Sequence, residues 1–98
     1  MNTADSFYNS KAWKAKRKSI HVRDKYRCRE CARFGKRRDA TIVHHANPIQ
    51  DRWDLRLHSL NLVSLCNKCH EKMHDRTSDK LTGAGEYWKE KCDKLMRN

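Results

Sequence analysis

Two adjacent histidines, His44 and His45, stand at the end of an apolar, β-branched run in the segment TIVHHANP. A neutral imidazole binds divalent metal ions and also accepts a proton near pH 7, so either ring has the chemistry for catalysis. Neighbouring side chains on a β-strand point to opposite faces. The two histidines should therefore have different roles, or one of them should have no chemical role.

Four of the five cysteines form two Cys-x-x-Cys pairs, Cys28 with Cys31 and Cys66 with Cys69. Each such turn aims two sulfurs at one point, and two turns complete the tetrahedral shell of Zn²⁺. The alternative, a redox motif, needs a surrounding βαβ pattern that neither pair has. Because four protein ligands leave no open position, the spacing predicts a structural zinc ion, with Cys92 left as a buried thiol without a chemical role.

A second histidine pair, His70 and His74, follows Cys69 directly. We expect a helix over HEKMHDR, on which residues four apart share one face and can bind one divalent cation. On its own this spacing also arises by chance in basic helices. Its position beside Cys69 strengthens the interpretation, because the zinc ion would fix both this helix and the segment that carries His44 and His45.

The elements that must position these residues can be read from the apolar pattern. We predict one domain over residues 1–98, with a core of about 26–75. A basic helix of about 10–25 has Ser10 as its N-cap and an apolar stripe of Ala12, Trp13, Ala15 and Ile20. A strand over 40–45, a long irregular connection over 46–61 and a strand over 61–65 should form an antiparallel hairpin. A linker after Asp75 should lead to a last helix of about 85–97, packed through Tyr87, Trp88, Cys92 and Leu95.

The composition points to a polyanionic partner. The 98 residues include 23 Lys and Arg against 12 Asp and Glu, a formal net charge of +11. Nucleic acid is the partner that this excess favours, although a merely soluble basic surface is the simpler alternative. The mean hydropathy is −1.12, so hydrophobic burial alone would hold so short a chain poorly. With no apolar run that could span a bilayer and no secretory leader, we expect a reducing, cytoplasmic location.

The order of these motifs resembles the HNH endonucleases, in particular the small zinc-containing proteins of phages and prophages. The resemblance covers about residues 7–75 and rests on Cys-x-x-Cys, then VHHANP, then NLVSLCNKCHEKMH. It implies a small α+β fold of the ββα-metal (His-Me finger) type with flanking N- and C-terminal helices. A departure is Leu60, where many relatives carry an acidic residue, and the loop also differs at Trp53 and His58.

Carried over position by position, the resemblance gives each motif residue a role. His44 and His70 would bind the catalytic metal, His45 would be the general base, and Asn61 would brace the loop that orients the base. His74 would be an additional ligand or a phosphate contact. We expect His21 and His58 to be non-catalytic, either exposed or held by local hydrogen bonds.

The resemblance predicts a metal-dependent DNA endonuclease that leaves 5′-phosphate and 3′-hydroxyl ends, working in a bacterial host. The cofactors would be structural Zn²⁺ and a catalytic divalent metal such as Mg²⁺, Mn²⁺ or Ni²⁺. DNA would be the main partner, phage packaging proteins are candidates for a second, and the chain would be a monomer or weak dimer. Rival functions are a non-catalytic zinc-ribbon DNA-binding protein and a protein–protein adaptor. The phosphate backbone would be held by Lys11, Lys14, Arg17, Lys18, Lys36, Arg37 and Arg38.

Overall fold

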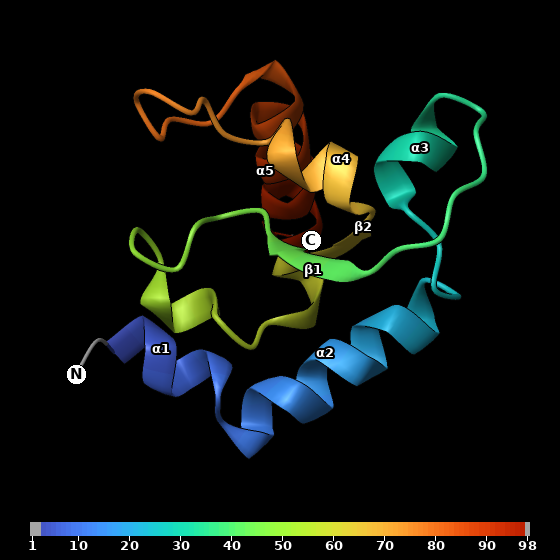
Figure 1. Cartoon of the computed structure of the whole chain (residues 1–98). Helices are drawn as coiled ribbons and strands as arrows, with labels where there is room; N and C mark the ends of the chain where they lie inside the picture. Colours follow the sequence, from blue (N-terminus) through green and yellow to red (C-terminus); the bar gives the residue numbers. More distant parts are fainter. Residues whose placement is uncertain (1–2, 98) are drawn as a thin grey trace.

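A two-stranded antiparallel hairpin lies at the centre of the molecule. The computed structural model describes residues 3–97, and Figure 1 shows the hairpin between α2 on one side and α3, α4 and α5 on the other. The helices are α1 (Thr3–Tyr8), α2 (Lys11–Arg23), α3 (Arg29–Arg33), α4 (Asn67–Glu71) and α5 (Gly83–Arg97), the strands are β1 (Ile42–His45) and β2 (Leu62–Leu65), and two 3₁₀ turns are η1 (Trp53–Leu55) and η2 (Ser59–Asn61). The predicted α+β arrangement is confirmed.

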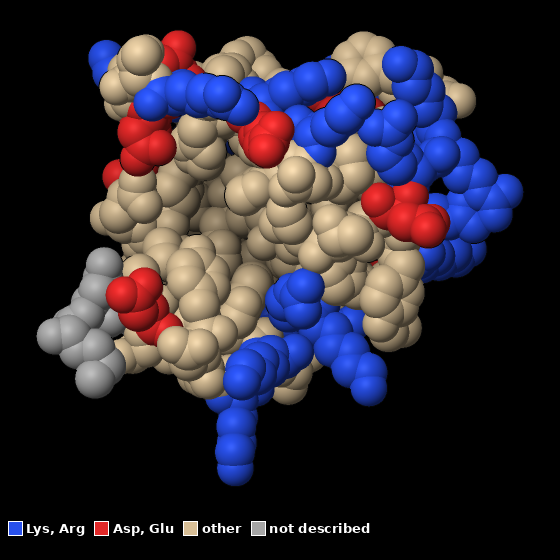
Figure 2. Space-filling model, in the orientation of Figure 1, with Lys and Arg blue, Asp and Glu red and all other residues tan. Residues whose placement is uncertain are grey.

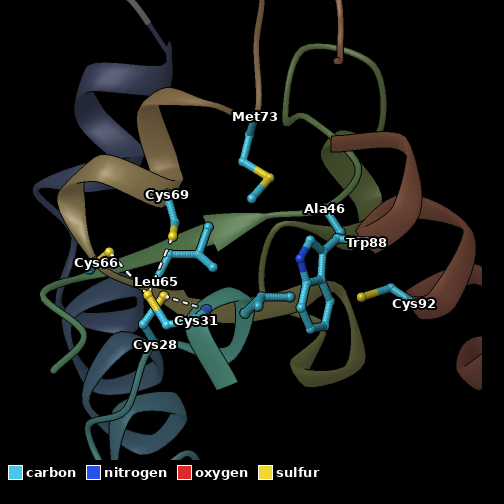
Figure 3. Close-up of a cluster of buried hydrophobic side chains, with 10 residues drawn as sticks. Cys28, Cys31, Ala46, Leu65, Cys66, Cys69, Met73, Trp88 and Cys92 are labelled. Atoms are coloured by element: carbon cyan, nitrogen blue, oxygen red, sulfur yellow. Dashed lines mark hydrogen bonds between the residues drawn. The ribbon is translucent and has the colours of Figure 1, made fainter. Parts of the chain in front are cut away.

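Strand alternation divides the core between the two faces of the hairpin. The register pairs His44 with Val63 and His45 with Leu62. One hydrophobic cluster packs α1 and α2 against the hairpin and consists of Phe7, Trp13, Ile20, Val43 and Leu62. A second cluster on the opposite face joins the cysteines to α5 and includes Val63, Leu65, Met73, Trp88 and Cys92 (Figure 3). Cys92 is buried, as the sequence predicts.

Helix α2 forms where it is predicted, but fewer of its apolar side chains pack against the hairpin than expected. The Ser10 hydroxyl caps its start by accepting a hydrogen bond from the backbone N–H of Trp13 at 3.1 Å. Trp13 and Ile20 are buried, two helical turns apart, whereas Ala12 and Ala15 are exposed. The expectation for these two alanines is wrong because the helix meets the hairpin along one line of side chains. Helix α1, which adds Phe7 to the cluster, is not among the predicted elements.

The helix predicted over HEKMHDR is wrong in extent. Helix α4 begins at Asn67, inside the second cysteine turn, and ends at Glu71. Beyond it, the backbone N–H and the hydroxyl of Thr82 donate to the carbonyls of Met73 and Lys72 respectively. These bonds from a distant segment compete with continued helix, and His74 lies instead in an isolated β-bridge with Leu81.

Helix α5 starts earlier than predicted and takes both glycines of the supposed linker. It begins at Gly83, and Gly85 is buried, with an added Cβ placed only 2.3 Å from the Met73 carbonyl oxygen. Glycine there lets the helix approach the backbone of the 73–82 segment. Trp88 and Cys92 pack inward as expected, but Leu95 is 41% exposed, so its predicted packing is wrong. Among the described residues, we find no helix with the length and apolar character that crossing a membrane requires.

Candidate functional site

The four predicted zinc ligands come together at one point. The Cys31 sulfur lies 3.9 Å from that of Cys66 and 3.6 Å from that of Cys69. The ligand atoms of all four cysteines, Cys28 included, lie within 4.8 Å of one another, and all four residues are buried. Tetrahedral Zn–S bonds of about 2.3 Å place sulfurs about 3.8 Å apart, so the cluster fits a structural zinc ion.

A cleft along β1 gathers the histidines. Its volume is about 430 Å³, and its lining includes His44, His45, His70 and His74. The ring of His44 lies with its centroid 5.4 Å from that of His70 and 5.9 Å from that of His74. His74 reaches the cleft through its β-bridge with Leu81 and not through the shared helix face expected from the sequence.

His44 is buried, and one of its ring nitrogens has no hydrogen bond within the described part of the chain. It is 2% exposed, and among the described residues its Nε2 atom has no hydrogen-bond partner. Burial, reinforced by the neighbouring rings of His70, His74 and His45, lowers the pKa of His44 to about 3. The ring is therefore neutral at physiological pH, with a lone pair available to a cation. A buried nitrogen without a partner is costly, and a bound divalent ion would remove that cost.

His45 is held in a different environment. Its Nε2 atom lies 3.0 Å from the carbonyl oxygen of Arg56, and its ring stacks on Trp13 with centroids 4.9 Å apart. A carbonyl only accepts, so Nε2 must carry the proton, and Nδ1 is then the basic nitrogen of the neutral ring. Burial lowers the pKa of His45, and the bond to Arg56 partly opposes this.

Both histidines belong to β1, so strand alternation applies to them in full. His44 and His45 both keep their antiparallel partners up to the end of the strand. His45 consequently packs with the aromatic residues of α1 and α2, and His44 approaches His70 and His74. Adjacent residues thus reach separate environments around one cleft.

Asn61 is fully buried beneath the long connection. Its side-chain oxygen accepts hydrogen bonds from the backbone N–H of Asn47 at 2.8 Å and from the Asn47 side chain at 2.9 Å. Its side-chain nitrogen donates to the carbonyls of Asn47 at 3.3 Å and Leu55 at 3.4 Å. Asn61, at the end of the connection, is therefore bonded to its start at Asn47 and to its middle at Leu55, the residue before Arg56.

Of the residues predicted to contact phosphates, one lines the histidine cleft and the others lie outside it. Arg17 lines the histidine cleft and donates to the Thr41 carbonyl at 3.0 Å. Figure 2 shows Lys and Arg side chains above and below a hollowed, mostly uncharged region of this face. The other six predicted contacts are exposed and do not line the cleft: Lys11, Lys14 and Lys18 on α2, and Lys36, Arg37 and Arg38 beyond α3.

The two histidines expected to be non-catalytic lie outside the cleft. His21 is buried, contrary to the exposed alternative, and its Nδ1 lies 3.3 Å from the Ser64 hydroxyl. His58 is exposed and accepts a hydrogen bond from the backbone N–H of Leu60 at 3.2 Å. Ser64 belongs to β2, so the bond of His21 ties α2 to the hairpin.

Several residues at the site carry no signal in the sequence. The Arg56 carbonyl is a backbone group, and nothing in a sequence distinguishes it from its neighbours. Trp13 is predicted only as a packing residue, yet it stacks on His45. Asn47 and Asp93 contact each other from segments far apart in the chain. Asp79 lines the cleft from the 73–82 segment, which the sequence indicates only as a linker.

Comparisons with known proteins agree with this geometry. The HNH endonuclease family matches residues 28–76. A probable HNH endonuclease of Lactococcus phage SK1 is 36% identical over 81 residues, which cover 81% of this chain and 83% of the phage protein. The crystal structure of the HNH endonuclease of the deep-sea thermophilic bacteriophage GVE2, which contains manganese ion, has a TM-score of 0.68 and 38% identity, covering 69% of this chain and 74% of that one.

These matches confirm the resemblance and the fold class predicted from the sequence. The matched residues 28–76 contain the cysteine cluster and also the hairpin and α4, which form the ββα unit. Helices α1, α2 and α5 lie outside that family match. The chain belongs to the HNH endonuclease family, and it is therefore a hydrolase of phosphodiester bonds.

Proposed function

We propose that this protein is a metal-dependent DNA endonuclease in which His45 is the general base. The observation that carries the proposal is the hydrogen bond between His45 Nε2 and the Arg56 carbonyl at 3.0 Å, on a ring that lines the cleft. This bond selects the tautomer whose Nδ1 accepts a proton, and the stack on Trp13 limits rotation of the ring.

In the proposed reaction, Nδ1 of His45 takes a proton from water as the water oxygen attacks phosphorus. The bond from phosphorus to the 3′ oxygen breaks, and this oxygen takes a proton from solvent, so that the products carry a 5′-phosphate and a 3′-hydroxyl. The Arg56 carbonyl stabilises the imidazolium that forms, because it accepts from Nε2–H in both protonation states. Asn61 keeps the loop that carries this carbonyl in place through its bond to Leu55.

His44 and His70, with His74 as an additional ligand or phosphate contact, would hold the catalytic cation. Burial, together with His74, lowers the pKa of His70, so this ring is also neutral near pH 7. A divalent cation bound there would act as a Lewis acid that offsets the negative charge developing at the scissile phosphate. Mg²⁺, Mn²⁺ and Ni²⁺ are the candidates, and the structure of the GVE2 enzyme with manganese supports Mn²⁺ among them.

The proposed substrate is DNA held through its phosphates. Arg17 lies in the cleft itself, and the exposed lysines of α2 extend the positive surface away from it. Because neutralising phosphates releases counterions, binding should be strongly salt-dependent. The cysteine cluster would hold the fold and take no part in the chemistry, since its four ligands leave no site for water or substrate.

The test is cleavage of supercoiled plasmid by the zinc-loaded protein with Mg²⁺, Mn²⁺ or Ni²⁺. We expect nicking or linearisation by the wild type, and a loss of about 10²-fold or more in His45→Ala. His58→Ala is the matched control, because His58 is exposed and lies outside the histidine cleft. If wild type and His45→Ala bind DNA equally but neither cuts it with any of the three metals, the protein is a zinc-stabilised DNA-binding module instead.

A further inference from the structure

Helix α5 lies outside the family match, yet one of its side chains is hydrogen-bonded into the site. The Asp93 carboxylate accepts a hydrogen bond from the Asn47 side-chain nitrogen at 2.9 Å. Lys89, one turn earlier on the same helix, pairs with the other carboxylate oxygen at 3.2 Å. Burial raises the pKa of Asp93, but the bonds from Asn47 and Lys89 outweigh it and hold the pKa below its usual range, so the carboxylate is ionised at neutral pH.

Asn47 connects Asp93 to Asn61 by hydrogen bonds. The Asn47 side-chain nitrogen has two hydrogens, and it donates to Asp93 and, at 2.9 Å, to the side-chain oxygen of Asn61. Two acceptors for two hydrogens fix the plane of the amide, which a single acceptor would not do. Asn47 and Asn61 are 2% and 0% exposed, so neither amide can exchange these partners for bulk water without a rearrangement.

Asn61 in turn holds the connection that presents the Arg56 carbonyl to His45. Its side chain donates to the Leu55 carbonyl at 3.4 Å, and the next carbonyl in the chain is 3.0 Å from His45 Nε2. We propose that Asp93 is a positioning residue for the nuclease site, which acts through Asn47 and Asn61 on the loop that orients His45. This inference rests on the proposed role of His45 as the base.

The surroundings of Asp93 indicate that its loss would loosen the site without unfolding the protein. Asp93 and Asn47 border a cavity of about 640 Å³ on the other side of the connection, lined also by Asp51, Leu55 and His58. The cavity can admit water, which would satisfy the hydrogen-bonding group freed on Asn47. Water would not hold the amide in one orientation as a fixed carboxylate does, so the effect should fall on catalysis more than on stability.

The experiment compares kcat and KM for plasmid cleavage by zinc-loaded, full-length wild type, Asp93→Ala and Asp93→Asn. Alanine removes the acceptor, whereas asparagine removes the charge but keeps an oxygen that can accept from Asn47. We expect Asp93→Ala to lower kcat about 10-fold with KM changed less than about 2-fold, and Asp93→Asn to stay within about 3-fold of wild type. Glu90→Ala is the control, because Glu90 is an exposed acid on the same helix and should leave both constants unchanged.

The ¹⁵N chemical shifts of the His45 ring provide a readout that a merely structural role would not change. Wild type, Asp93→Asn and Glu90→Ala should show the Nε2–H tautomer, and Asp93→Ala should show a mixture of tautomers in protein that remains folded. The inference is overturned if Asp93→Ala keeps wild-type kcat, or if its loss of activity comes with unchanged His45 shifts. Should wild type itself fail to cut DNA, the proposed function fails, and the shifts still decide whether Asp93 orients His45.

Discussion

His44 and His45 are consecutive residues with opposite surroundings, and each environment suits one kind of chemistry. The Nε2 atom of His44 is buried without a partner among the described residues, which suits an atom that binds a cation. The Nε2 atom of His45 is engaged with the Arg56 carbonyl, which leaves Nδ1 to act as a base. Since the backbone of β1 sends the two side chains to opposite faces, neither role disturbs the other.

The pH dependence of cleavage should report the environment of His45. A general base acts only when neutral, so activity is present above its pKa and is lost as the pH falls through it. Burial lowers the pKa of His45 from the ordinary value of 6.5, despite the opposing bond to Arg56. We expect the acidic limb of kcat/KM, measured with saturating metal, to have its midpoint below pH 6.5. A midpoint at or above that value would contradict the role assigned to this ring.

Substitutions of the two histidines should have different effects on the affinity for the catalytic metal. We expect His44→Ala to weaken Mn²⁺ binding by about 10-fold or more, because it removes a buried ligand, and His45→Ala to change it by less than about 3-fold. Isothermal titration of zinc-loaded protein with Mn²⁺ measures both effects without cleavage. Equal weakening in the two variants would show that the ligand and base roles are not divided as proposed.

At the scale of elements, the segment between α4 and α5 brings His74 to the cleft by an unexpected route. The carbonyls of Lys72 and Met73 accept hydrogen bonds from Thr82. The segment folds back, and His74 forms a β-bridge with Leu81. Helix α5 packs directly behind it, with Gly85 against the Met73 carbonyl. The close approach of this helix therefore fixes the position of His74.

Substituting the two glycines of α5 should give opposite results. A Cβ on Gly85 would lie 2.3 Å from the Met73 oxygen and 2.8 Å from the Leu81 Cδ2, so Gly85→Ala should lower the free energy of unfolding by about 1–3 kcal/mol. At Gly83 an added Cβ meets no described atom within 4 Å, so Gly83→Ala should be neutral or stabilise by up to about 1 kcal/mol. Urea denaturation of the zinc-loaded variants measures both, and equal effects would contradict the packing of α5 on this segment.

For the whole molecule, the hairpin separates two hydrophobic clusters, and the cysteines anchor one of them. One cluster contains Phe7 and Trp13 from the N-terminal helices, and the other joins the four clustered cysteines to Trp88 of α5. The buried Glu30 carboxylate accepts from the Trp88 ring N–H at 3.1 Å, which links the first cysteine turn to α5. A metal that holds both cysteine turns thus stabilises the core and, through it, the histidine cleft.

Removing zinc should therefore unfold the protein and not merely inactivate it. Binding of structural zinc contributes on the order of 10 kcal/mol in small domains, comparable with the whole stability of a chain of this size. We expect a strong chelator, or Cys66→Ser, to abolish the cooperative thermal transition in circular dichroism, and zinc to restore it after chelation. Retention of a cooperative transition in fully zinc-free protein would contradict this dependence.

Affinity for DNA should depend on the charge of the whole surface. The chain has a formal net charge of +11, and binding through phosphates should fall steeply with salt. Lys14→Ala should reduce the slope of log K against log salt by about 1 if Lys14 contacts a phosphate. Lys94→Ala, an exposed lysine on α5 across the hairpin from α2, is the control and should leave the slope unchanged. Fluorescence anisotropy with a labelled duplex measures both slopes.

The sequence by itself determined the features that depend on short-range geometry. A Cys-x-x-Cys turn brings its two sulfurs together wherever it occurs, and the four cysteines do form one cluster. The alternation of side chains along a strand likewise separates His44 from His45 without reference to the rest of the fold. Helix α2 follows from its N-cap at Ser10 and from the spacing of Trp13 and Ile20.

Only the tertiary structure decided which groups from distant segments complete the site. The bond from His45 to the Arg56 carbonyl and the bond from Asn47 to Asp93 both depend on how the long connection folds and on where α5 packs. His74 reaches the cleft because Thr82 ends the preceding helix, an effect that local propensity does not predict. Such contacts require side chains to compete for partners throughout the folded chain, so they follow from packing and not from spacing along the sequence.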